Sequence, residues 1–265
     1  MAEIIIDVKP EVIVLASAYI EAPFDIGKAE LEAQGFPIIP GEENAVLRIQ
    51  EGKDSFVSQN GNWLREDGIY VPGKGAVLTK NPPIMKNPRE ATEAHRNGKE
   101  FYPTDEQIEK ALADCVKLED GNIPTNRFKD DERTVYLFGK HAEAYGDFLK
   151  DAKVTEMPVI LAEMQDKAFA RKAWFAKLGS GHSALGCNRD LSYDKWVRGV
   201  RRVDAEGIAQ NFLPAQLEET RAVMPYTEEQ LTRYSQIARG VRAGERPNSD
   251  LEEIADFFEG LKSHK

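Results

Sequence analysis

The chain has 265 residues and a formal net charge of −10, with 41% hydrophobic and 30% charged residues. This length allows one large domain or two smaller ones, and the composition excludes a largely disordered chain. The negative balance argues against a protein that coats nucleic acid or an anionic membrane with its whole surface, because like charges repel.

The cysteines and the apolar runs bear on the compartment. Cys115 and Cys187 are too few for a disulfide framework, and reduced thiols are typical of a cytosolic protein. The apolar run at 12–16 is too short for a signal peptide or a membrane span. We therefore expect a cytoplasmic protein that does not enter a membrane. No metal or nucleotide motif is recognised, so no cofactor is expected.

The first part of the chain is expected to be rich in β-structure. Apolar, β-branched runs at 4–6 and 12–15 predict strands, and the loop-like stretch 22–43 has room for a short helix at 28–33. Between 44 and 80, Asn-Gly at 60–61, Asp-Gly at 67–68 and a glycine turn at 73–75 separate further apolar runs. Asn-Gly and Asp-Gly favour hairpin turns. The pattern therefore predicts a meander of three or four antiparallel strands.

The rest of the chain is expected to be mainly helical. Asn81-Pro82-Pro83 ends the β-rich part, and Thr104 with Gln107 forms a capping box, which is typical of a helix start. The predicted fold class is α+β: an N-terminal antiparallel β meander (1–86) followed by a mainly helical part (87–265), as two regions or one continuous domain. Helices are expected at 88–96, 104–115 with Cys115 buried, 130–150, 158–178, from 192, 213–224, 227–239 and from 249.

The segment 165–202 reverses the charge of the chain. It holds nine basic and three acidic residues, interleaved with five aromatic ones. A local basic field attracts anions, guanidinium groups bind phosphate or carboxylate in pairs of hydrogen bonds, and Trp stacks on bases. We therefore expect a binding protein whose anionic partner is a nucleic acid or an acidic protein face. The expected contact residues are Lys167, Arg171, Trp174, Arg189, Trp196, Arg198, Arg201 and Arg202.

Two other interpretations of this segment stay open. In the first, its aromatic residues belong to the core and its arginines only lie along the surface. In the second, the glycine-rich loop 179–190 forms the pocket of an enzyme that acts on a small phosphorylated or carboxylated substrate. His182 would be its acid or base and Cys187 its nucleophile, since a thiolate needs a neighbouring base. The local pattern matches no cysteine-hydrolase signature.

Overall fold

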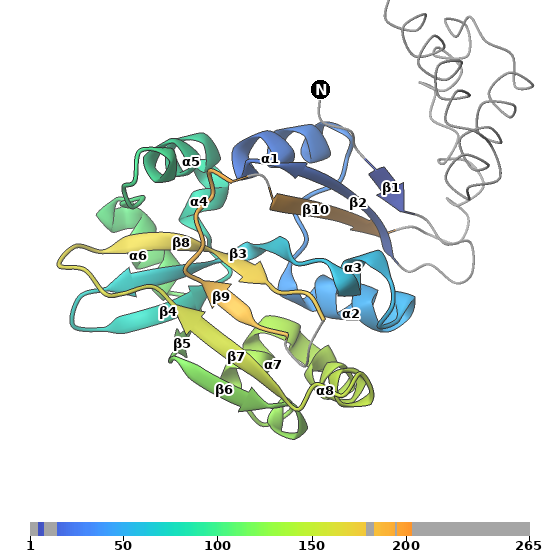
Figure 1. The fold of residues 1–265 in the computed structure, drawn as a ribbon. Coiled ribbons are helices and arrows are strands. Elements are labelled where there is room, and N and C mark those ends of the chain that lie inside the picture. Colours follow the sequence, from blue (N-terminus) through green and yellow to red (C-terminus); the bar gives the residue numbers. More distant parts are fainter. Residues whose placement is uncertain (1–4, 8–14, 179–182, 194, 203–265) are drawn as a thin grey trace, which may run out of the picture. The chain divides into compact units, whose positions relative to one another are not determined.

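The computed structural model describes residues 5–7, 15–178, 183–193 and 195–202, and everything below refers to these (Figure 1). Contacts divide the chain into one unit, Met1–Ala205, and a second, Glu206–Lys265; the described residues all belong to the first. The helices expected at 213–224, 227–239 and from 249 lie outside the described residues.

A mixed sheet organises the described part of the chain (Figure 1). Its main path runs β1-β2-β10-β3-β8-β9-β7-β6, and β4 joins β3 on one side and β5 on the other. The pairs β10–β3 and β7–β9 are parallel, whereas the other pairs are antiparallel. The strands are β1 (Ile5–Asp7), β2 (Leu15–Ala22), β3 (Asn62–Val71), β4 (Gly75–Thr79), β5 (Cys115–Leu118), β6 (Gly121–Pro124), β7 (Glu156–Leu161), β8 (Phe169–Phe175), β9 (Leu185–Cys187) and β10 (Lys195–Arg202).

Helices cover the sheet on both faces. Leu64 belongs to the cluster formed with α2, α7 and α8, whereas the neighbouring Trp63 meets Phe24 of α1 edge-on. Consecutive strand residues point to opposite faces, so α1 covers the other side. The helices are α1 (Phe24–Ala33), α2 (Gly41–Glu51), α3 (Phe56–Gln59), α4 (Pro83–Lys86), α5 (Pro88–Arg96), α6 (Asp105–Leu112), α7 (Glu132–Phe138) and α8 (Ala142–Asp151), with short 3₁₀ turns η1 (Thr125–Arg127) and η2 (Gly139–His141).

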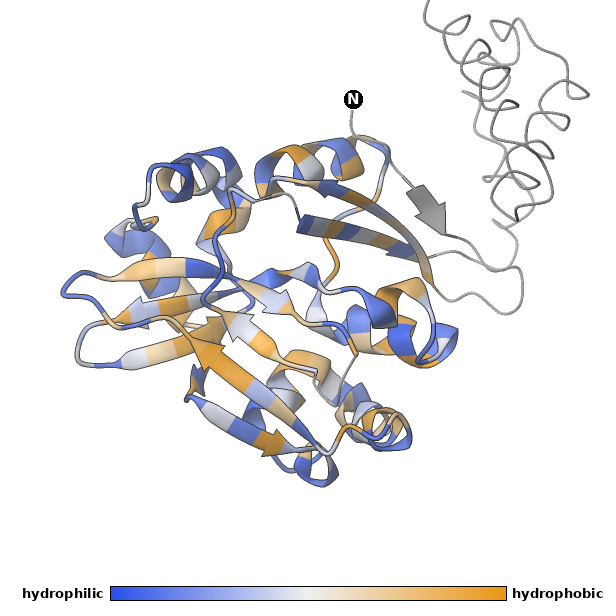
Figure 2. Ribbon diagram, viewed as in Figure 1, coloured by the Kyte–Doolittle hydropathy of each residue, from blue (hydrophilic) through white to orange (hydrophobic). Residues whose placement is uncertain are grey.

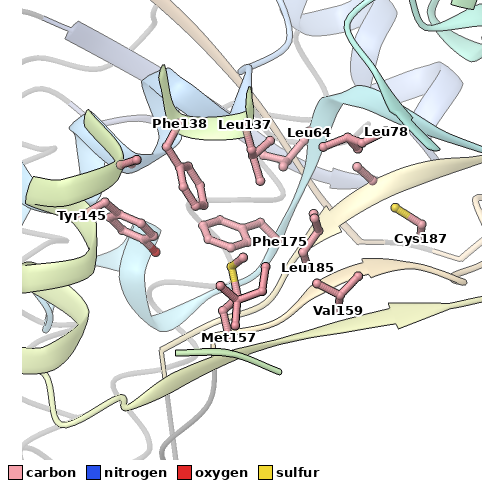
Figure 3. Close-up of a cluster of buried hydrophobic side chains, with 14 of the residues drawn as sticks. Leu64, Leu78, Leu137, Phe138, Tyr145, Met157, Val159, Phe175, Leu185 and Cys187 are labelled. Atoms are coloured by element: carbon pink, nitrogen blue, oxygen red, sulfur yellow. The ribbon is translucent and has the colours of Figure 1, made fainter. Parts of the chain in front are cut away.

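Aromatic side chains fill the core between α7, α8 and the sheet (Figure 3). The rings of Phe138, Tyr145 and Phe175 lie 4.8 to 5.9 Å apart, centre to centre. Burying each such side chain contributes about 2 kcal/mol relative to leaving it exposed. Figure 2 shows the matching hydropathy pattern, with apolar residues along β7 to β9 and hydrophilic ones over α5 and α6.

An irregularity in β3 changes the direction of its side chains. Trp63 pairs with Trp174 of β8, and Asp67 pairs with Lys172. Between these two pairs β3 advances by four residues while β8 advances by two. Such a bulge interrupts the inward and outward alternation of a strand. Glu66 and Asp67 follow the irregularity, and both are buried, as are most residues of β3.

The expected meander followed by helices is wrong. Residues 41–51 and 56–59 are helices, and strands from before and after residue 86 pair in one sheet. Neither Asn-Gly nor Asp-Gly makes a hairpin, since both lie at or inside β3. A Cβ on Gly61 would meet the Trp174 ring at 2.4 Å, and one on Gly68 would meet the Cβ of Cys187 at 2.8 Å. These glycines permit close packing. The turn at 73–75, with an exposed Lys74, does join β3 to β4.

The helical predictions hold best where a cap marks the start. α6 begins at Asp105, after the N-cap Thr104 with its complete capping box. α5 begins at Pro88 without a side-chain cap. The helix expected at 130–150 begins after Asp131 as an N-cap but is broken at Gly139, whose φ of 57° is left-handed. Cys115 starts β5 and is only partly buried, so its expected place in a helix core is wrong.

The expected boundary after residue 86 does not coincide with the division of contacts after residue 205. β3 and β4 precede residue 86, and their partners β5 and β8 follow it. Strands from both sides of residue 86 therefore pair in one sheet.

Candidate binding surface

The segment 165–202 forms strands where helices were expected. Residues 158–178 contain most of β7 and all of β8, and the helix expected from residue 192 is β10. The apolar residues of β8 are buried on both faces of the sheet. The helical spacing of Leu161, Met164, Ala168 and Phe175 predicted the helix, but these residues lie on β7, on the following loop and on β8, so their period was coincidental.

Arg171 ties β8 to two loops. Its Nε donates to Glu100 Oε2 at 2.7 Å and its Nη2 to Glu100 Oε1 at 2.5 Å. Its Nη1 donates to the carbonyls of Asn188 and Arg189 at 3.4 and 3.3 Å. Paired bonds between guanidinium and carboxylate are among the stronger and more directional polar contacts. Arg171 therefore fixes the loop after β9 and is occupied within the chain.

His95 of α5 anchors the same loop, a role that its sequence context did not indicate. Its Nδ1 accepts a hydrogen bond from the backbone N–H of Leu191 at 3.0 Å, and the side chain is buried. Burial lowers the pKa of His95, and the charge of Arg171 adds to this; Asp190 and Glu100, each 3.9 Å away, oppose it. The neutral imidazole is therefore the form that holds the loop.

Exposed side chains gather on the loops that Arg171 and His95 hold. Gln165 bonds both the Tyr102 hydroxyl and Glu100 at 3.3 Å, and the Lys167 ammonium lies 4.8 Å from the centre of the Tyr102 ring. Tyr102, Met164 and Tyr193 are 41%, 46% and 63% exposed. We call residues 100–102, 162–168 and 188–193 the loop surface.

Trp174 and Arg189 lie at the edge of the loop surface. The Arg189 guanidinium is 5.2 Å from the centre of the Trp174 ring, and Trp174 meets Trp63 edge-on at 5.0 Å. Trp174 is buried, so Arg189 covers a core residue while its own side chain stays exposed. Trp174 therefore supports the surface from beneath.

The expected contact residues of β10 lie elsewhere. Arg198 is buried, donates to the Ser17 hydroxyl at 3.0 Å, and lies over the rings of Tyr19 and Phe56 at 4.8 and 5.6 Å. Trp196 meets the same two rings edge-on.

Arg198 and Arg201, both expected as contact residues, do not share one face of β10. Arg201 lies over the Phe36 ring at 4.7 Å. Arg198 and Arg201 point to opposite sides of the strand, since side chains alternate. The side chain of Arg202 lies outside the described part.

Cys187 is unsuited to the nucleophilic role. It is fully buried on β9, and burial raises the pKa of its thiol to about 12, with the nearby Asp67 charge adding to the effect. A thiolate nucleophile requires the opposite shift. His182 lies outside the described residues, so the pairing of the two stays a prediction.

The described residues contain no cluster of metal ligands, but they form a pocket that is lined in part by cations. In this part of the chain, no group of three or more His, Cys, Asp or Glu side chains is placed to hold a metal ion. A pocket of about 540 Å³ is lined in part by Arg65, Lys80, Lys86 and Lys110, and it shares no lining residue with the loop surface. These four cations precede residues 165–202 in the sequence: Arg65 lies on β3, Lys80 directly after β4, Lys86 on α4 and Lys110 on α6.

Comparisons with known proteins place the fold. Neither a protein-family model nor a curated protein matches the chain. A solved structure from work on the accommodation of massive sequence variation in Nanoarchaeota by the C-type lectin fold is similar, with a TM-score of 0.52 and 15% identity. The match covers 71% of this chain and 97% of that one.

The present chain has a C-type lectin-like fold. At this identity the likeness concerns the fold alone. The expected meander followed by a helical part is therefore wrong. The similarity is to a C-type lectin fold, and the sheet of this chain includes strands from both ends of the described residues. As for membranes, no described helix combines the length and the apolar character that a span requires.

Proposed function

We propose that this chain is a binding protein that contacts a partner protein through the loop surface. The observation that carries the proposal is the exposure of Tyr102, Met164 and Tyr193 on three loops that hydrogen bonds connect to the scaffold. Tyr is enriched among the residues that dominate binding energy in protein interfaces. Loops on a rigid scaffold are the usual place for such residues.

Two exposed cations of the loop surface can contact acidic groups of a partner. The Lys167 ammonium lies over the Tyr102 ring and the Arg189 guanidinium over the Trp174 ring, so both charged groups are positioned at the surface by aromatic contacts. Rim charges of this kind mainly raise the rate of association with an oppositely charged face. The exposed Glu163 and Asp166 beside Lys167 would repel the closely spaced phosphates of a nucleic acid, and equally a uniformly acidic face. The proposed partner is therefore a protein that sets individual carboxylates against Lys167 and Arg189.

The fold supports the same proposal. The C-type lectin fold of the Nanoarchaeota protein accommodates massive sequence variation. A scaffold that tolerates variation allows recognition residues to change without loss of the core, which suits a binding protein. The two free cysteines support a reducing, cytoplasmic location as part of this proposal.

Site-specific photocrosslinking tests the proposal. A photoreactive residue at position 102, 164 or 193 should yield the same protein adduct in cells. The matched controls are Ile26 and Val135, which are 46% and 43% exposed on α1 and α7, outside the loop surface. The double variant Lys167→Glu with Arg189→Glu should weaken the adducts at all three loop positions. Adducts at the control positions alone, or none at the loop positions, would refute the loop surface as the contact.

A further inference from the structure

A lysine and an aspartate meet inside the sheet, beneath the loop surface. Lys172 of β8 and Asp67 of β3 face each other across the two antiparallel strands. Neither side chain has any exposed surface, and Lys172 Nζ lies 2.6 Å from Asp67 Oδ1. Both lie in the core because β3 and β8 are buried along most of their length.

The other contacts of the pair involve one donor and one acceptor from the backbone. Lys172 Nζ donates to the Arg65 carbonyl at 2.5 Å and lies 5.2 Å from the centre of the Phe24 ring. Asp67 Oδ2 accepts from the Ile84 N–H at 2.8 Å. Glu66 is a second buried carboxyl, and its charge acts on Lys172.

Burial favours the neutral forms of both groups. It lowers the pKa of Lys172 and raises the pKa of Asp67, while their mutual attraction opposes both shifts. A buried ion pair must recover a large loss of hydration, so two charges in this position are costly. A neutral amine beside a neutral carboxyl is also the combination from which an amide can form.

We propose that Lys172 and Asp67 are joined by an intramolecular isopeptide bond that forms once the sheet has folded. The Lys172 nitrogen attacks Cγ of Asp67, a C–N bond forms, and the bond from Cγ to Oδ1 breaks. Oδ1 leaves as water with one proton that the nitrogen gives up and one that the carboxyl gives up. No oxidant, metal or other reactant is required.

The product would keep the backbone contacts of the pair. The single N–H of the amide can donate to the Arg65 carbonyl, and the remaining oxygen can accept from the Ile84 N–H. An ammonium has three donors to satisfy, whereas the amide nitrogen has one. The bond therefore converts a buried amine and a buried carboxyl into one amide, without leaving a buried polar group unmatched.

Mass spectrometry tests the bond without requiring any variant to fold. The intact full-length chain, measured under denaturing conditions, should weigh one water molecule less than its sequence. Trypsin should then release peptides 66–74 and 172–177 as one linked species, uncleaved after residue 172, because an acylated lysine is no longer a trypsin site. Lys172→Arg, which cannot condense but keeps the positive charge, should have its full mass.

An internal control separates burial from distance. Lys28 and Glu32 also lie 2.6 Å apart, but they are partly exposed, and they should show no linkage. A wild-type chain of full sequence mass, with peptides 66–74 and 173–177 recovered separately, would overturn the proposal. Linkage of Lys28 to Glu32 at the same level would also overturn it, because the specific geometry of the core would then not be the cause.

Discussion

Two regions of this molecule combine arginines with aromatic rings, and they use them in opposite ways. On β10, Arg198 is enclosed by Tyr19 and Phe56 and has become part of the core. On the loop surface, Arg189 lies over Trp174 but stays exposed. The guanidinium-to-ring distances are similar in the two regions, from 4.8 to 5.6 Å. The contact alone therefore does not indicate whether an arginine serves folding or recognition; its burial does.

Replacing one arginine from each region tests this distinction most strongly. Arg198→Ala should lower the free energy of unfolding by about 3 kcal/mol. The substitution opens a cavity beside two rings and removes the hydrogen bond that Arg198 donates to the Ser17 hydroxyl. Arg189→Ala should change it by less than about 0.5 kcal/mol, as is usual at exposed positions. Urea unfolding of the two variants measures both. Equal losses would mean that burial does not separate the two regions.

A smaller effect is expected where an arginine anchors the loop surface. Arg171→Lys keeps the charge but cannot pair with both oxygens of Glu100 or reach the Asn188 carbonyl in the same geometry. We expect a loss of about 2 kcal/mol in unfolding free energy. Amide hydrogen exchange should also become faster at residues 188–193. The control is Arg189→Lys, for which exchange there should be unchanged; if both variants behave alike, Arg171 is not the anchor.

The smallest expected effect is on the pH dependence of the free energy of unfolding, through His95. Because the pKa of His95 is lowered in the folded chain, the unfolded chain binds more protons, and His95 costs stability as the pH falls through its ordinary value of about 6.5. His95→Gln should remove this part of the pH dependence, whereas His141→Gln should retain it. Glu66, whose pKa is raised by burial, acts in the opposite direction, so the difference between variants is the quantity to measure. A wild-type and a His95→Gln curve of the same slope would contradict the role of His95.

Local signals along the chain predicted local structure well. The capping box at Thr104 and the N-cap at Asp131 each mark an observed helix start, because a cap satisfies backbone groups within a few residues. Glycine was ambiguous: at 73–75 it makes a turn, but Gly61 and Gly68 are required by side chains more than 100 residues further along the chain. That requirement leaves no trace in the neighbouring sequence.

The candidate site depended even more on distant pairing. Lys167 and Arg189 come from the basic segment, but the residues that hold their loops, Glu100 and His95, do not. Arg198 was expected at the surface because its partners Ser17, Tyr19 and Phe56 lie at the other end of the described chain. Charge counting located the segment but could not separate its exposed arginines from its buried ones.

The position of β10 between β2 and β3 has a consequence for synthesis. The strand at 195–202 pairs with 15–22 and touches Trp63, so the first strands emerge from the ribosome long before their neighbour exists. Until then the open edges of β2 and β3 are free to pair with other chains. Pairing across such a separation also slows folding, since a long loop must close first. A nascent chain that stalls before residue 195 should therefore depend on chaperones and be prone to aggregate.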